Sequence, residues 1–379
     1  MTYGEKALKL HKEKKGKIEI SSKVKANSLD DLSVIYTPGV GAVSSAISRR
    51  RDDVWEYTNR GNTVAIVSDG TSVLGLGNLG PRAAIPVMEG KSVIFKKFAN
   101  IDAVPLCIDA CEVEDIVKFC KQIEPSFGGI NLEDIAAPRC FEILDRLESE
   151  CDIAVFHDDQ DGTAIVILAG MINACRVTGK ILNEQRVIIN GAGAAGIATA
   201  RLLIAHGVKD IILLDSIGVI YTGRRHLNIY KKEIARETNP RKIKGMLRDA
   251  IKQTDIFIGL SKGNLANKRM VRSMNDNPII FAMANPIPEI MPDEAKAAGA
   301  SIIGTGRSDF PNQINNALVF PGVFKGLLDG WKRRMTTKMK LSAAIAISYT
   351  VKPSKNKILP NITDKRVVDA ISRTIIKKK

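Results

Sequence analysis

Short apolar runs alternate along the chain with longer segments in which apolar residues recur every three or four positions. The short runs, rich in Ile, Val, Leu and Phe, are typical of buried strands, and the longer segments fit helices. This alternation predicts an α/β fold in which helices cover parallel sheets. The runs that we interpret as strands are residues 62–70, 91–98, 151–156, 186–190, 210–216, 255–261, 278–286 and 301–306.

A longer apolar stretch, residues 163–175, follows an acidic cluster. It is shorter than the roughly 20 residues that cross a bilayer, and we interpret it as a buried helix rather than a membrane span. The start of this stretch marks a domain boundary near residue 160. We predict an N-terminal α/β domain, residues 1–160, followed by a doubly wound parallel-sheet (Rossmann) domain with C-terminal helices, residues 161–379.

The segment RVIINGAGAAGIATARLLIAHG joins a β-rich run, a glycine turn and a helical pattern. In the spacing G-x-G-x-x-G, the first glycine makes the turn, the second lets a pyrophosphate approach the backbone, and the third packs helix on strand. Free N–H groups at the helix N-terminus then meet the pyrophosphate. We predict a dinucleotide site at Gly191, Ala192, Gly193, Ala194, Ala195 and Gly196.

The choice between NAD and NADP depends on the residues after the next predicted strand. Asp215 ends this strand, where an acidic side chain accepts hydrogen bonds from the free ribose hydroxyls of NAD. Arg224 and Arg225 follow closely enough to reach the 2′-phosphate of NADP if the loop folds back. The pattern leaves both cofactors open, with a slight preference for NAD.

Composition and charge narrow the class of protein. The 379 residues are 45% hydrophobic and 26% charged, as in an ordinary globular protein. The formal net charge of +15 admits a nucleic-acid-binding protein as a remote alternative, but aromatic residues make up only 5% and no stacking motif accompanies the charge. We expect no nucleic-acid partner, and a basic surface that attracts anionic metabolites.

The six cysteines form no CxxC pair and the N-terminus resembles no secretory signal, so we expect free thiols in the cytoplasm.

Acidic residues gather at two places 26 residues apart. INLEDIAAP carries Glu133 and Asp134, and FHDDQDGTA carries Asp158, Asp159 and Asp161. The intervening segment has the length of a helix and a returning strand, which would bring both groups to one edge of the sheet. Converging carboxylates suit Mg²⁺ or Mn²⁺, and the lack of paired Cys or His argues against zinc. Surface loops or helix caps remain the alternative on this pattern alone.

Seven separated motifs resemble those of malic enzymes, in the same order and at the same spacing. They cover residues from about 15 to 330, and the chain is similar to the short prokaryotic form of that family. The resemblance implies oxidative decarboxylation of L-malate to pyruvate and CO₂ with reduction of NAD or NADP and a divalent metal. The motifs are VIYTPGVGAV, SDGTSVLGLGNLGPRAAIPVMEGKSVIFKKFANIDAVP, INLEDIAAP, FHDDQDGTA, NGAGAAG, FAMANPIPEI and GRSDFPNQINNALVFPG.

The resemblance also implies roles for individual residues. Tyr36 corresponds to the general acid that protonates C3 of enolpyruvate, and Lys91 to the base that takes the malate hydroxyl proton. Such a lysine requires a pKa lowered by burial or by a nearby cation. Asp158 is expected to tune Lys91, and Asp161 to begin or cap the following helix. The implied metal ligands are Glu133, Asp134 and Asp159, and the asparagines implied near the substrate carboxylate and the nicotinamide are Asn285 and Asn316.

Two departures from the family pattern matter. Ser72 stands where larger malic enzymes have an arginine that pairs with a substrate carboxylate, so a different group must hold that carboxylate. Ile217 replaces a lysine of many relatives, which mildly favours NAD. A malolactic enzyme, which converts malate to lactate, is the nearest alternative. The resemblance further implies a homodimer or a dimer of dimers, in which Tyr36 and Lys91 complete a site whose metal ligands belong to the partner.

Overall fold

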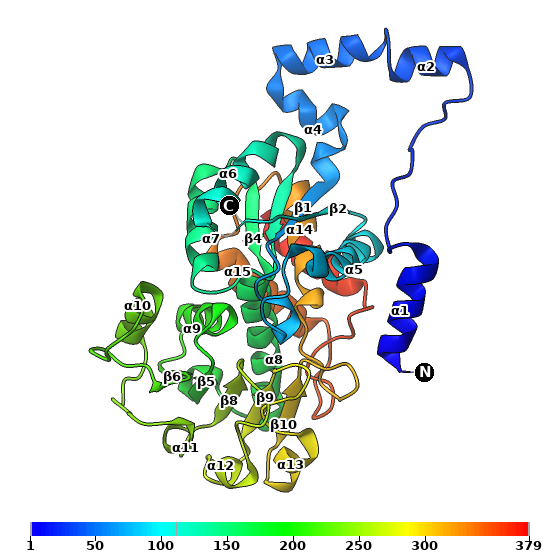
Figure 1. Ribbon diagram of the computed structural model, residues 1–379. Helices are drawn as coiled ribbons and strands as arrows, with labels where there is room; N and C mark the ends of the chain where they lie inside the picture. Colours follow the sequence, from blue (N-terminus) through cyan, green and yellow to red (C-terminus); the bar gives the residue numbers. More distant parts are fainter. Residues whose placement is uncertain (1, 111, 378–379) are drawn as a thin grey trace.

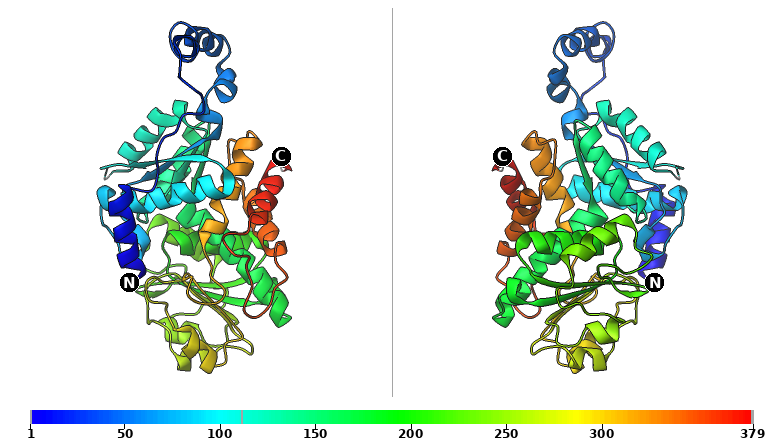
Figure 2. Two further views of the ribbon diagram at one scale, coloured as in Figure 1. Left: turned by 90° about the vertical axis from the view of Figure 1, so that its right-hand side faces the viewer. Right: turned by 90° about the vertical axis from the view of Figure 1, so that its left-hand side faces the viewer.

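A computed structural model describes residues 2–110 and 112–377 as two parallel sheets with helices on their faces (Figures 1 and 2). The first sheet is entirely parallel, with strand order β2-β1-β3-β4. Because β1 lies between β2 and β3, the sheet has a switch point between β1 and β3, where α/β proteins place their ligands. The strands are β1 (Thr63–Ser68), β2 (Asp102–Cys107), β3 (Gly129–Leu132) and β4 (Ala154–His157).

The helices that connect these strands include one that the apolar pattern assigned wrongly. Residues 91–98 were expected as a strand, but they belong to α5 (Pro81–Ala99). Met88, Ser92 and Phe95 are buried on one side of α5, so the period is helical. Proline at the first helical position favours this start. The other connections are α6 (Val113–Ile123) and α7 (Arg139–Glu150).

The second sheet has the order β10-β9-β8-β5-β6-β7, with every pair parallel except β6 and β7. This is the doubly wound arrangement of a dinucleotide-binding domain, and it confirms the predicted fold class. The strands are β5 (Arg186–Asn190), β6 (Asp210–Asp215), β7 (Gly218–Val219), β8 (Ile256–Gly259), β9 (Ile279–Ala282) and β10 (Ile302–Thr305). The helices along this sheet are α9 (Ala194–His206), α10 (Ile229–Glu237), α11 (Leu247–Ala250), α12 (Lys268–Arg272) and α13 (Pro292–Ala297).

The predicted apolar helix is α8 (Thr163–Thr178), which lies between the two sheets (Figure 1). Residues 158–178 are long and apolar enough to cross a membrane, but most of this segment is buried in the protein. It packs against α9 and α15 (Thr337–Tyr349), as a core helix does.

The last helices return to the first sheet. α14 (Phe320–Asp329) packs against α5 and α16 (Arg366–Lys377). The ring centroids of Phe95 and Phe320 are 4.7 Å apart, and Phe324 lies 5.9 Å from Phe156 of β4. The C-terminal helices therefore complete the N-terminal core, and the boundary at residue 160 stays a prediction.

The N-terminal segment extends away from this body. It contains α1 (Tyr3–Lys14), α2 (Leu29–Ile35), α3 (Val40–Arg49) and α4 (Val54–Tyr57). We call residues 28–50, which include α2 and α3, the arm, because both views show these helices projecting beyond the sheets (Figures 1 and 2). No residue of α2 or α3 is buried.

Candidate active site

The two acidic motifs meet at the carboxyl edge of the first sheet. Leu132 of β3 is in register with His157 of β4. Glu133 follows β3 directly, and Asp158 and Asp159 follow β4 in a π-helical turn, η5 (Asp158–Gly162). Parallel neighbours release their carboxyl ends at the same edge, so the predicted helix-and-strand spacing brings both motifs together.

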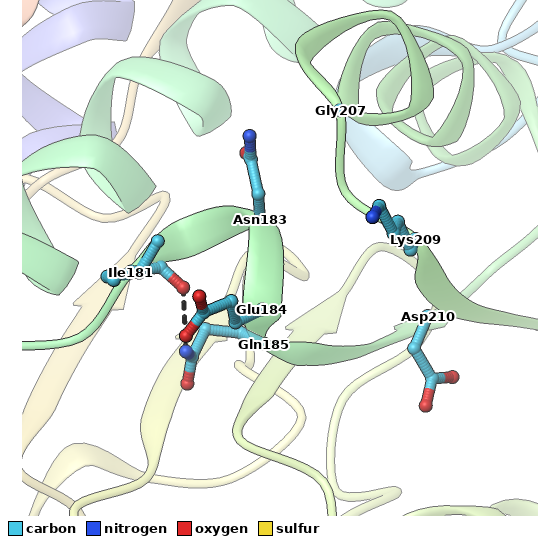
Figure 3. A pocket seen from close by; sticks show the side chains of 7 residues that line it. All are labelled: Ile181, Asn183, Glu184, Gln185, Gly207, Lys209 and Asp210. Atoms are coloured by element: carbon cyan, nitrogen blue, oxygen red, sulfur yellow. Dashed lines mark hydrogen bonds between the residues drawn. The ribbon is translucent and has the colours of Figure 1, made fainter.

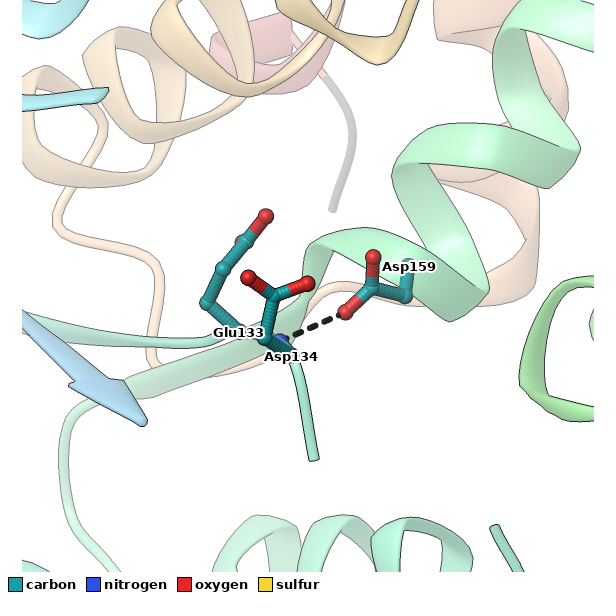
Figure 4. Close-up of side chains that lie close together, drawn as sticks. All are labelled: Glu133, Asp134 and Asp159. Atoms are coloured by element: carbon teal, nitrogen blue, oxygen red, sulfur yellow. Dashed lines mark hydrogen bonds between the residues drawn. The ribbon is translucent and has the colours of Figure 1, made fainter. Parts of the chain in front are cut away.

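Three carboxylates form a compact cluster at this edge (Figure 4). Glu133, Asp134 and Asp159 each offer an oxygen, and these oxygens lie within 4.8 Å of one another. The Asp134 N–H donates to Asp159 Oδ2 at 2.8 Å, which fixes two of the groups. Oδ2 of Asp134 is buried and has no hydrogen-bond partner among the described residues. Hard oxygen ligands and an unpaired buried oxygen fit a divalent cation such as Mg²⁺ or Mn²⁺.

Lys91 reaches this cluster from α5. Its Nζ donates to Glu133 Oε2 and to Asp158 Oδ2. The lysine side chain is 8% exposed, and Nζ lies 4.3 Å from the centroid of the Phe320 ring. Lys91 thus joins the acidic residues of its own chain, and the expectation that it serves a partner's metal ligands is wrong for this structure.

The charges shift the pKa values of these groups. Burial lowers the pKa of Lys91, but Asp158, Glu133 and Asp159 outweigh burial and raise it above the ordinary value. Burial raises the pKa of Glu133 and Asp158 against the effect of Lys91. For Asp134, burial and then Asp159 and Glu133 raise the pKa to about 8. Without a cation Lys91 therefore stays protonated, contrary to the lowered pKa expected of a base.

Asp161 lies in η5, which continues directly into α8, so it precedes this helix as predicted. α8 begins without a side-chain cap, so Asp161 does not cap it. Its Oδ2 lies 2.7 Å from Nζ of Lys340 on α15, and the two side chains are 10% and 18% exposed. The ion pair instead connects η5 to a helix near the C-terminus.

The glycine turn has the expected geometry. Gly191 has φ +129°, a left-handed value that favours glycine, and Gly193 is the N-cap of α9. A Cβ on Gly196 would overlap the Gly191 carbonyl oxygen, whereas a Cβ on Gly193 would meet no atom within 4 Å. The open space at Gly193 and the free N–H groups of α9 fit a pyrophosphate.

Asp215 lies at the end of β6, as predicted, but its carboxylate is paired within the chain. Arg224 and Lys231 both contact it, and the Ile217 N–H donates to Oδ1 at 3.0 Å. Burial raises the pKa of Asp215, but the hydrogen bonds from Arg224 and Lys231 outweigh burial and lower it to about 2. Arg224 has folded back as its sequence position allowed.

The remaining predicted residues lie at three different places. Asn316 is next to η5, since a Cβ on Gly162 would lie 3.4 Å from its Cβ. Asn285 is exposed and follows β9, where its carbonyl oxygen is close to Gly75 of the loop after β1. Tyr36 ends α2 on the arm and is 72% exposed, so this chain does not bring it to its own carboxylate cluster.

Three further buried groups in and after the strands were not predicted. Asp69 follows β1, is buried and pairs with Arg139 at 2.7 Å. His157 is fully buried, and its Nδ1 lies 3.8 Å from Asp159 Oδ2. Glu289 is fully buried and accepts from Ser261 N and Ala284 N, which ties the loops after β8 and β9 together. Asp69 shares the strand-end position of the acidic motifs, a signal that could have identified it.

A surface pocket lies at the amino ends of strands β5 and β6 of the second sheet (Figure 3). Residues before β5 and at the start of β6 line it, among them Gln185 and Asp210. Ligands of open α/β sheets bind at the carboxyl ends of strands, so this pocket is distinct from the dinucleotide turn.

The doubly wound sheet and its glycine turn, beside the first sheet with its buried lysine and carboxylates, define a dinucleotide-dependent oxidoreductase. Residues 13–148 match the malic enzyme N-terminal domain, and residues 160–378 match the malic enzyme NAD binding domain. The chain therefore belongs to the malic enzyme family, as the motifs predicted.

Individual relatives agree with this assignment. A protein of Bacillus subtilis named bifunctional malic/malolactic enzyme is 51% identical over 100% of this chain and 93% of its own. The NAD-dependent malic enzyme of Geobacillus stearothermophilus is 49% identical over 95% of this chain and 76% of its own. The crystal structure of NAD-dependent malic enzyme from Thermotoga maritima superposes with a TM-score of 0.95 at 46% identity, and the match covers 98% of this chain and 99% of that one.

Proposed function

We propose that the chain converts L-malate to pyruvate and CO₂ while it reduces NAD or NADP, with Mg²⁺ or Mn²⁺ bound. The observation that carries this proposal is the buried Lys91, which contacts both Asp158 and Glu133, the latter a member of the three-carboxylate cluster. Glu133, Asp134 and Asp159 would hold the metal. When bound, a divalent cation lowers the pKa of a coordinated hydroxyl and draws electrons from the breaking C3–C4 bond.

Lys91 and Tyr36 would move the two protons of the reaction. The charge of a bound cation would lower the pKa of Lys91 so that its amine is neutral, and Nζ would then take the proton of the C2 hydroxyl as hydride leaves C2 for the nicotinamide. Asp158 and Glu133 hold the resulting ammonium by hydrogen bonds that the structure already contains. After CO₂ leaves, the Tyr36 hydroxyl donates a proton to C3. Asn316, next to η5, and Asn285, beside Gly75 of the loop after β1, would orient malate and the nicotinamide.

A second copy of this chain would supply Tyr36. On the arm, Leu29 is 82% exposed and Val34 is 71% exposed, beside the exposed Tyr36. Apolar side chains on a projecting helix are typical of a protein interface. We propose a homodimer in which the arm of one chain covers the carboxylate cluster of the other.

We also propose a cytoplasmic location. The five cysteines that the structure describes are all free thiols, which supports a reducing compartment, and Cys111 lies outside the described residues.

A malolactic reaction is the second candidate, because a relative at 51% identity is named for both activities. The two reactions differ in the fate of the reduced cofactor. Net accumulation of NADH or NADPH with pyruvate indicates the malic reaction, whereas lactate without net reduced cofactor indicates the malolactic one.

The test is an assay of malate with NAD and with NADP, each with and without EDTA, on the parent and on Lys91→Ala. We expect pyruvate and reduced cofactor from the parent, loss of activity with EDTA and recovery with Mn²⁺. Lys91→Ala should lose at least about a hundredfold in kcat, in the range for a removed general base. Lys97→Ala, an exposed lysine on the same helix, is the matched control. Full parent activity in EDTA would contradict the metal proposal.

A further inference from the structure

Three charged side chains meet at the end of β6, the strand end where a Rossmann domain contacts the adenosine ribose. Asp215 ends β6, Arg224 follows β7 and Lys231 lies in α10. Arg224 Nη1 donates to Asp215 Oδ1 at 2.9 Å, and Nη2 donates to Oδ2. Lys231 Nζ donates to Oδ2 at 2.7 Å. Arg224 is further fixed by donation to the Gly218 carbonyl oxygen at 2.9 Å.

These contacts occupy the acceptor sites of Asp215. A carboxylate offers about four lone-pair sites. Arg224 fills two, Lys231 a third and the Ile217 N–H a fourth. A ribose hydroxyl would have to displace one of these donors to bind Asp215. The acidic residue that ordinarily selects NAD is thus already satisfied by its own chain.

The charge of the trio also differs from that of a free aspartate. One carboxylate faces a guanidinium and an ammonium, so the trio carries a net positive charge. The side chains of Asp215 and Arg224 are each 9% exposed, while that of Lys231 is 22% exposed. Lys231 has three N–H donors and uses one on Asp215, so two remain for a ligand. A 2′-phosphate would meet an ammonium here rather than an unpaired carboxylate.

We propose that Lys231 binds the 2′-phosphate of NADP, and that the chain therefore binds NADP more tightly than NAD. This inference rests on the proposed dinucleotide site and names the residue that decides its specificity. The Asp215–Arg224 pair removes the repulsion that an aspartate would exert on the phosphate, and Lys231 adds a charge-assisted hydrogen bond.

The test compares adenosine fragments by isothermal titration calorimetry on the full chain, which separates binding from turnover. Adenosine 2′,5′-bisphosphate and 5′-AMP differ only in the 2′-phosphate, and NADP and NAD repeat the comparison with whole cofactors. We expect at least about tenfold tighter binding of each 2′-phosphorylated ligand, as one hydrogen bond to a charged group provides. Lys231→Met should abolish this ratio, because it removes the donor to the 2′-phosphate and frees an acceptor site of Asp215 for the ribose hydroxyl of 5′-AMP and NAD.

Lys232→Met is the matched control, because Lys232 is the exposed neighbour and its loss changes the net charge equally. It should keep the ratio, and Lys231→Arg should restore most of it. Thermal unfolding of each variant checks that the fold is intact. If both fragments bind the parent equally, or if the two methionine variants behave alike, the inference is wrong while the dinucleotide site stands. If no adenosine ligand binds the parent, the dinucleotide site itself is wrong.

Discussion

At the scale of single residues, four carboxylates and one lysine share the carboxyl edge of the first sheet. The structure gives Asp134 a pKa of about 8 through burial and through its neighbours Asp159 and Glu133. A ligand carboxylate must lose its proton before it binds a metal. Below pH 8 a proton therefore competes with the cation for this site.

The pH dependence of metal binding follows from this competition. Because the folded pKa of Asp134 is raised, its proton is bound below pH 8 and lost above it. We expect Mn²⁺ affinity to rise by up to about tenfold per pH unit from pH 6 to 8 and then to level off. Calorimetry at pH 7 in buffers of different ionisation enthalpy should show proton release on Mn²⁺ binding. Mn²⁺ binding without proton release at pH 7 would contradict the raised pKa of Asp134.

The meeting of Glu133 and Asp134 with Asp159 at one edge of the first sheet followed from the sequence, because the segment between them has the length of a helix and a returning strand. The contact of Lys91 with Asp158 was expected from the family resemblance, whereas its contact with Glu133 was not, since that depends on the rotation of α5 about its axis. Asp215 was predicted at the end of its strand, but its pairing depends on a loop that returns from nine residues later. Local pattern therefore identifies positions, and tertiary packing decides the partners.

At the scale of elements, the strand assignment of residues 91–98 failed because a short apolar run has no distinctive period until its neighbours are included. β2 was missed since it contains Pro105 and is half-buried, as an edge strand allows. β3 was missed because two of its four residues are Gly129 and Asn131, which are uncommon in strands and interrupt the apolar run. Five strands of the second sheet were found, since each is a buried run bounded by loop residues, but the two-residue β7 was missed.

Two alanine substitutions in the glycine turn between β5 and α9 should have different effects, one on cofactor binding and the other on stability. Gly193→Ala places a Cβ in open space, so its fold should be unchanged while dinucleotide binding falls by at least about tenfold. In Gly196→Ala the added Cβ would clash with the Gly191 carbonyl oxygen and push α9 away from the turn. This substitution should lower the free energy of unfolding by about 1–3 kcal/mol. Urea unfolding and cofactor titration of both variants separate the effects. Equal loss of stability would contradict the assigned geometry.

A second element-scale prediction concerns η5 and α15. The ion pair between Asp161 and Lys340 anchors the turn that carries Asp158 and Asp159. Lys340→Met leaves a mostly buried carboxylate unpaired, which should cost about 1–3 kcal/mol and weaken Mn²⁺ binding. Lys340→Arg should recover both, and Lys338→Met, an exposed lysine on α15, should change neither. Unchanged Mn²⁺ affinity in Lys340→Met would show that the pair does not position the metal ligands.

At the scale of the whole molecule, the arm separates Tyr36 from the carboxylate cluster of its own chain. The order and period of the motifs predict the two sheets, but they carry no information on which chain provides a residue to a site. That depends on an interface, and the exposed apolar side chains of α2 and α3 are the structural indication of one.

Complementation tests whether Tyr36 acts on a second chain. Tyr36→Phe and Lys91→Ala should each be nearly inactive alone. In a mixed dimer, one site combines the intact Lys91 of the first variant with the intact Tyr36 of the second, and the other site has neither. With random pairing half of the dimers are mixed and half of their sites are intact, so co-expressed chains should recover about a quarter of parent activity. Purification through two different tags should raise this to about a half. If both residues acted within one chain, every mixed site would lack one of them and no activity would return.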